Sequence, residues 1–97
     1  MLLAQKLKES RKQCNLPQRK VAAALDMDTA TYCKIENGNY SPRREQVIEL
    51  ASILHIDENE LLTLWLADQV YGIVGFEKNA DEVLNIVAEN IVKYNKN

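Results

Sequence analysis

The sequence predicts an all-α fold around one hydrophobic core, and three observations lead to this prediction. Apolar residues recur every three or four positions through most of the chain, which is the period of an amphipathic helix. Short stretches that contain proline, glycine or asparagine separate the segments with this period. The chain has 97 residues, 46% of them hydrophobic, which is enough for a single modest core but not for two.

The first two predicted helices are short and follow each other closely. Leu3 and Leu7 lie on one apolar stripe of a helix over residues 2–14, which ends before Pro17. The second helix covers residues 18–25. Pro17 suits its start, because a backbone N–H in the first turn of a helix has no partner within the helix.

The third predicted helix begins at Thr29 and has at most nine residues before Asn37 and Gly38 end it. Asp28 is a good N-cap, because its carboxylate can accept the free N–H groups of the first turn. Asp26, in the preceding turn, can adopt the left-handed conformation that glycine usually supplies. A helix this short is not stable alone, so we expect Tyr32 and Ile35 to pack inward.

Three further helices complete the predicted chain. One covers residues 45–54, after a loop punctuated by Gly38 and Pro42. The next begins at Asp57 with a wide apolar face, and the last covers about residues 80–94 with apolar positions at three- and four-residue spacing.

The net charge of −2 conceals an uneven distribution of charge along the chain. Residues 1–44 carry nine Lys or Arg and four acidic residues, a net charge of +5, whereas residues 45–97 carry three and ten, a net charge of −7. A basic half on an acidic chain suits a polyanion that approaches from one side. The alternative is a solvated surface whose charge happens to be uneven.

Residues 18–38 have the spacing of a helix-turn-helix motif, and the stretch from Leu3 to about Leu66 resembles the Xre family of bacterial and phage repressors. The matching residues are Gln18, Ala22, Leu25, Ile35-Glu36-Asn37-Gly38, Pro42 and Leu50-Ala51-x-x-Leu54. The resemblance implies a five-helix DNA-binding domain over residues 1–66. The remaining residues, 67–97, are expected to form a C-terminal helical extension. The resemblance also implies a structural ion pair between Arg11 and Glu36, which would keep the Glu36 carboxylate from repelling phosphates.

The second helix of the motif is then the one that enters the major groove of DNA. With its apolar side committed to the core, the opposite side carries Thr29, Ala30, Cys33 and Lys34. Lys34 can reach guanine O6 or N7, Thr29 can bond a base edge, and Ala30 offers only an apolar contact. The Cys33 thiol is a weak hydrogen-bonding partner for a base. For each of these residues the alternative is an ordinary solvent-facing helix position.

Phosphate contacts are expected at the helix ends around this motif. Gln18 begins the first motif helix, where the resemblance implies a bond to a phosphate. Asn37, Arg43 and Arg44 flank the other side of the recognition helix. Arg19 is a further candidate, although a solvated charge explains it equally well.

The predicted extension carries more apolar side chains than a monomer of this size can easily bury, so we expect it to form a homodimer that reads a palindromic operator. An alternative is that the last helix folds back on its own domain. The residues expected in the dimer interface are Trp65, Leu66, Val70, Val83, Val87 and Ile91.

The predicted function is a sequence-specific DNA-binding transcriptional regulator whose partners are double-stranded DNA and a second copy of itself. The alternative is an antitoxin-type protein whose tail binds a toxin partner. We expect no enzyme, because the single histidine, His55, has no persuasive catalytic neighbour in the sequence. We likewise expect no cofactor, metal, small-molecule ligand or membrane, and a cytoplasmic location with reduced cysteines.

Overall fold

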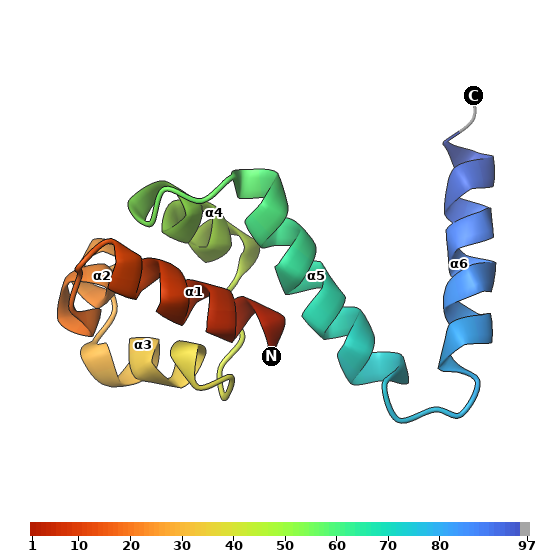
Figure 1. Cartoon of the computed structure of the whole chain (residues 1–97), viewed down its shortest axis with the longest axis horizontal. Helices are drawn as coiled ribbons and strands as arrows, with labels where there is room; N and C mark the ends of the chain where they lie inside the picture. The colour runs from red at the N-terminus through yellow and green to blue at the C-terminus, as the bar shows by residue number, and fades with distance from the viewer. Residues whose placement is uncertain (96–97) are drawn as a thin grey trace.

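The computed structural model describes residues 1–95, and within these residues the chain forms six α-helices and no strand (Figure 1). The all-α class is confirmed, and the helix bounds agree with the predicted ones to within one or two residues. The helices are α1 (Leu2–Gln13), α2 (Gln18–Ala24), α3 (Thr29–Glu36), α4 (Arg44–Ile53), α5 (Glu58–Val74) and α6 (Ala80–Tyr94). The last two residues of the predicted extension, 96 and 97, lie outside the described residues.

Local side-chain contacts set several helix starts and turns, as the sequence predicts. The carboxylate of Asp28 accepts a hydrogen bond of 2.7 Å from the backbone N–H of Thr31 and so caps α3. Asp57 caps α5 in the same way through the N–H of Glu60, at 2.9 Å. Asp26 adopts the left-handed conformation, with φ of 57°, in the turn between α2 and α3.

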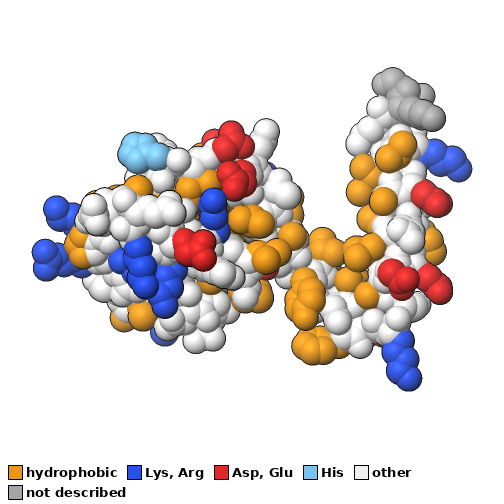
Figure 2. All heavy atoms as spheres, in the orientation of Figure 1, with side chains coloured by type: hydrophobic (Ala, Val, Ile, Leu, Met, Phe, Trp, Pro, Cys, Tyr) orange, Lys and Arg blue, Asp and Glu red, His pale blue; other side chains and the backbone are white. Residues whose placement is uncertain are grey.

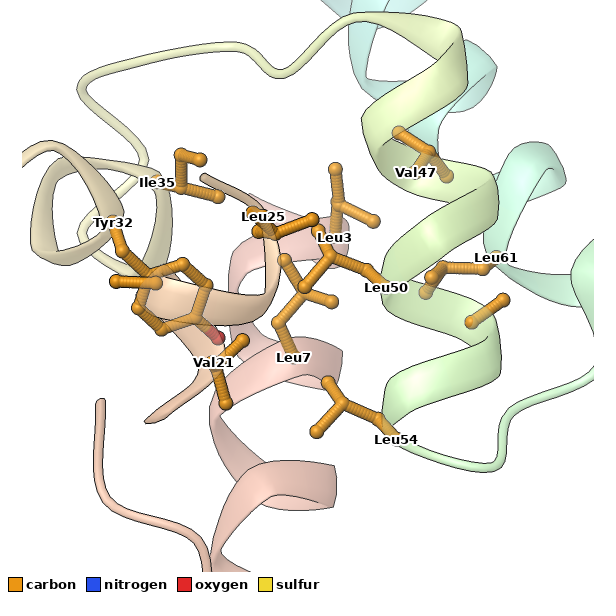
Figure 3. Packing of buried hydrophobic residues seen from close by; sticks show 12 residues of the cluster. Leu3, Leu7, Val21, Leu25, Tyr32, Ile35, Val47, Leu50, Leu54 and Leu61 are labelled. Carbon is orange, nitrogen blue, oxygen red and sulfur yellow. The ribbon is translucent and has the colours of Figure 1, made fainter. Parts of the chain in front are cut away.

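One hydrophobic core holds α1 to α5 together (Figure 3). Leu7, Val21, Tyr32, Leu50 and Leu61, one from each of these five helices, are fully buried in it. Burying a large apolar side chain stabilises a fold by about 1.5–3 kcal/mol. Because α3 has only eight residues, this packing rather than helix propensity keeps it helical.

Helix α5 runs without interruption for 17 residues and crosses the boundary predicted at residue 66. Its first half packs on the core through Leu61, Leu62 and Trp65. The indole N–H of Trp65 donates to the carbonyl of Pro42 at 2.8 Å. Trp65, which we expected in a dimer interface, is therefore used at least in part within its own chain.

The start of α1 is tied to the second half of α5. The two carboxylate oxygens of Asp68 accept hydrogen bonds of 3.0 Å from the backbone N–H groups of Leu2 and Leu3. These groups belong to the first turn of α1, where helical N–H groups lack partners, and Met1 offers no side-chain cap.

Helix α6 stands away from α1–α4 and buries none of its residues (Figure 1). It is joined to α5 by a turn that begins at Gly75. In this structure α6 does not fold back onto the core of its own chain. None of the described helices is both long enough and apolar enough to cross a membrane.

Candidate nucleic-acid interface

The helix pair α2–α3 is fixed by small and apolar residues on its inner side. Ala22 is almost completely buried, and the N–H of Met27 bonds back to its carbonyl at 3.0 Å in the turn. From α3, Tyr32 and Ile35 point into the core. The two helices therefore pack as one unit, and the other side of α3 remains free.

The free side of α3 carries the residues that we predicted to contact bases. Thr29, Ala30 and Lys34 are exposed, and Cys33 is half-buried. Asn37, just after the helix, donates its side-chain amide to the Cys33 sulfur at 3.6 Å. Thr29 and Lys34 are thus exposed polar residues on this face, whereas the Cys33 thiol already has a neighbour.

A buried ion pair joins α3 to α1. Arg11 Nε lies 2.7 Å from Glu36 Oε2, and Arg11 Nη2 donates to Glu36 Oε1 at 3.1 Å, so the pair is bidentate. The side chain of Arg11 is 12% exposed and that of Glu36 is 1% exposed. Arg11 also bonds the carbonyl of Leu16 at 2.9 Å, which fixes the end of α1.

The protonation of this pair follows from its surroundings. Burial by itself would raise the pKa of Glu36, but hydrogen bonds led by those from Arg11 outweigh it and hold the pKa below its usual value. The hydrogen bond to Glu36 raises the pKa of Arg11, more than burial lowers it. Glu36 is therefore ionised at neutral pH, and its charge is neutralised by Arg11 close to α3.

Gln18 belongs to the same hydrogen-bonded group. Its side-chain Nε2 donates to Glu36 Oε1 at 3.1 Å, so the first residue of α2 is held against the last residue of α3. Sequence reasoning predicted a phosphate contact for Gln18 and missed this hydrogen bond to Glu36. The amide nitrogen has two hydrogens, so one of them is still available to an outside acceptor.

The remaining predicted phosphate contacts lie at helix ends. Arg19 and Arg43 are exposed, and the N–H of Arg43 donates to the side-chain oxygen of Gln46 at 2.9 Å where α4 begins. The Arg44 guanidinium lies 5.3 Å from the centre of the Trp65 ring, a cation–π distance that the sequence did not reveal. Figure 2 shows Lys and Arg side chains gathered on the body of the molecule farthest from α6.

Tyr32 has a buried hydroxyl that makes no hydrogen bond. Burial raises the pKa of Tyr32 far above its ordinary value, with smaller effects from the nearby charges of Glu36 and Arg11. The hydroxyl lies next to the Arg11–Glu36 pair but has no hydrogen bond of regular geometry, so its burial costs free energy on folding.

Two short helices joined by a tight turn define a helix-turn-helix domain when the second helix packs on the core with one side and exposes the other side to solvent. Residues 2–64 match the family model described as a helix-turn-helix domain. The chain belongs to this family, which confirms the resemblance seen in the sequence and makes it a DNA-binding rather than an enzymatic domain.

Two similar proteins extend this result. The cryptic phage CTXphi transcriptional repressor RstR of Vibrio cholerae serotype O1 (strain ATCC 39315 / El Tor Inaba N16961) is 29% identical over 69 residues, which cover 71% of this chain and 62% of the repressor. The chain thus spans less than two thirds of that repressor. A crystal structure of a transcriptional regulator from Listeria innocua has a TM-score of 0.58 at 20% identity, over 98% of this chain and 96% of the other. The second likeness shows the fold alone.

Proposed function

We propose that this protein is a transcriptional regulator that binds a specific DNA sequence in the cytoplasm, as a homodimer on a palindromic operator. The observation that carries the proposal is the exposed polar face of α3, which the Arg11–Glu36 ion pair joins to α1. A short helix that is packed on the body of its domain on one side and exposed on the other is suited to enter the major groove.

Base recognition in this proposal rests on few groups. Lys34 donates to guanine O6 or N7, Thr29 bonds a base edge, and Ala30 and Cys33 make apolar contacts. Because this face offers a single charged donor, part of the specificity comes from the shape and deformability of the operator.

Affinity comes mainly from phosphates. Gln18 bonds one phosphate through the amide hydrogen that Glu36 does not use, and Arg19, Asn37 and Arg43 bond others beside it. Arg44 is the least available of the predicted contacts, since its guanidinium already lies on Trp65. The acidic half of the chain limits adhesion to nonspecific DNA.

A twofold dimer would place two α3 helices about 34 Å apart, one turn of DNA, which is why we propose a palindromic operator. Support comes from the uncovered apolar side chains of α5 and α6, which need a partner.

The test is a titration of labelled DNA from the region upstream of the protein's own gene, against scrambled DNA of equal length, at several salt concentrations. We expect Lys34→Ala to cost about 1–3 kcal/mol on the operator and little on scrambled DNA. Arg43→Ala should weaken both and reduce the salt slope by about one. The exposed Lys93 of α6 provides a matched control, and Lys93→Ala should change nothing. Equal affinity for both DNAs would contradict the regulator.

The antitoxin alternative is kept because α6 is uncovered. A toxin-binding tail is expected to order only on its partner. Hydrogen exchange of residues 80–94 in the isolated protein separates the two functions, since protection favours the regulator and rapid exchange favours the antitoxin.

A further inference from the structure

The C-terminal third of the chain exposes an apolar surface of the size that an interface needs. Among the described residues, eleven of the fourteen exposed large hydrophobic side chains lie between Leu66 and Tyr94, and each of the eleven is 42% to 92% exposed. Those of the eleven that line a groove beside α5 or lie on one stripe of α6 leave several hundred Å² uncovered, which is comparable to the ~800 Å² per partner of a standard interface.

Part of this surface is concave. A groove of about 750 Å³ lies between the start of α1, the second half of α5 and the start of α6. Its walls include Leu2, Val70, Tyr71 and Leu84. The one charged side chain in its lining, Asp68, already accepts two backbone hydrogen bonds, so no unpaired carboxylate opposes an apolar occupant.

Another part is a ridge on α6. Apolar residues at alternating four- and three-residue spacing form one stripe, the pattern of a helix that packs along another helix. The stripe consists of Ala80, Leu84, Val87, Ile91 and Tyr94. Ala80 and Leu84 line the groove of their own chain, whereas the rest of the stripe continues past the groove and stays exposed. Figure 2 shows charged side chains along the outer side of α6.

We propose that two copies of this chain exchange the second halves of their α6 helices, so that Val87 and Ile91 of each copy fill the groove of the other while Ala80 and Leu84 still line the groove of their own chain. The proposal rests on the homodimer proposed above and names the contact that forms it. A second copy is the occupant because one chain carries both an unfilled groove and an exposed apolar ridge. In a twofold dimer the ridge of each copy packs into the groove of the other, so both surfaces are buried together. The product is a four-helix bundle made of α5 and α6 from each copy.

The test measures the mass of the full chain by sedimentation, without DNA, over a range of micromolar concentrations. The wild type should approach twice the chain mass of 11.1 kDa. Val87→Asp should raise the dimer dissociation constant by about tenfold or more, because the carboxylate would enter an apolar groove. The matched control is Val92→Asp, on the same helix at similar exposure but outside the stripe, and it should leave the dimer intact.

A mixing experiment tests the exchange itself. Val70→Asp alters the groove and Val87→Asp alters the ridge, so each variant alone should dissociate at a concentration at which the wild type is still a dimer. A mixed dimer of the two keeps one undamaged groove with one undamaged ridge, so the mixture should regain association. Failure of the mixture to associate, or equal damage from Val92→Asp, would overturn the exchange.

This outcome can be separated from that of the DNA-binding proposal. A wild-type chain that stays monomeric while binding its operator would overturn both the exchange and the homodimer, but would keep sequence-specific DNA binding, and would leave the groove to a different protein. Lys34→Ala should lose specific DNA binding and keep the full dimer mass, because Lys34 lies on α3 and not on α5 or α6.

Discussion

Removal of the Glu36 carboxylate is the sharpest perturbation of this fold, because the group is buried and accepts hydrogen bonds from Arg11 and Gln18. The Arg11 side chain is 12% exposed in the wild type, and Glu36→Ala leaves its guanidinium without a counter-charge. Breaking a buried ion pair on one side costs about 3–5 kcal/mol. Since Arg11 keeps its bond to the Leu16 carbonyl, we expect a value near the lower end, about 3 kcal/mol, a large part of the 5–15 kcal/mol that typically stabilises a domain.

The assay is urea unfolding followed by far-ultraviolet circular dichroism at pH 7, with Glu49→Ala as the control at an exposed glutamate of α4. The control should change stability by less than about 0.5 kcal/mol. Arg11→Met combined with Glu36→Leu should cost much less than the sum of the two single changes, because no lone charge remains. A loss below about 1 kcal/mol for Glu36→Ala would refute the argument that the pair clamps α3.

The same pair makes stability depend on pH. The folded-state pKa of Glu36 lies below its ordinary value, so the ion pair contributes fully above pH 4.5. Its contribution is lost as the pH falls from 4.5 through the folded-state pKa. The wild type should therefore lose its advantage over Glu36→Ala in that acid range and keep it at neutral pH, which urea unfolding at a series of pH values measures.

Three further predictions concern single groups. Tyr32→Phe should raise the free energy of unfolding by about 1 kcal/mol in urea titrations, since it removes a buried hydroxyl with no partner; a clear loss would mean that the hydroxyl is bonded. Asp68→Ala should lower it by about 0.5–2 kcal/mol and speed amide exchange at Leu2 and Leu3, whereas unchanged exchange would count against the cap. The hydrogen bond from Thr31 lowers the pKa of Asp28, so the helical signals of α3 in NMR spectra should weaken at acid pH but not at neutral pH.

Most of the helices could be predicted because the information for each is local. An apolar stripe is visible within one segment, and the caps formed by Asp28 and Asp57 act on residues only three positions away. The exposed side of α3 followed in the same way, because Tyr32 and Ile35 mark its inner side.

The polar contacts between distant segments could not be predicted, because packing of the core brings the partners together. Gln18 and Glu36, which form a hydrogen bond, are 18 residues apart in the sequence, and Trp65 and Pro42 are 23 residues apart. The orientation of α5 could not be predicted from the sequence for a different reason. Apolar residues surround much of this helix, so its sequence does not separate Trp65, which packs on the core, from Leu66, which is exposed.

The hydrogen bonds from Leu2 and Leu3 to Asp68 join residues 66 and 65 positions apart, and the match to the helix-turn-helix family ends at residue 64. A fragment that ends at residue 64 would therefore lack Asp68, which accepts the hydrogen bonds from the first turn of α1. We expect α1 of such a fragment to fray at its N-terminus, although the cut is at the C-terminus.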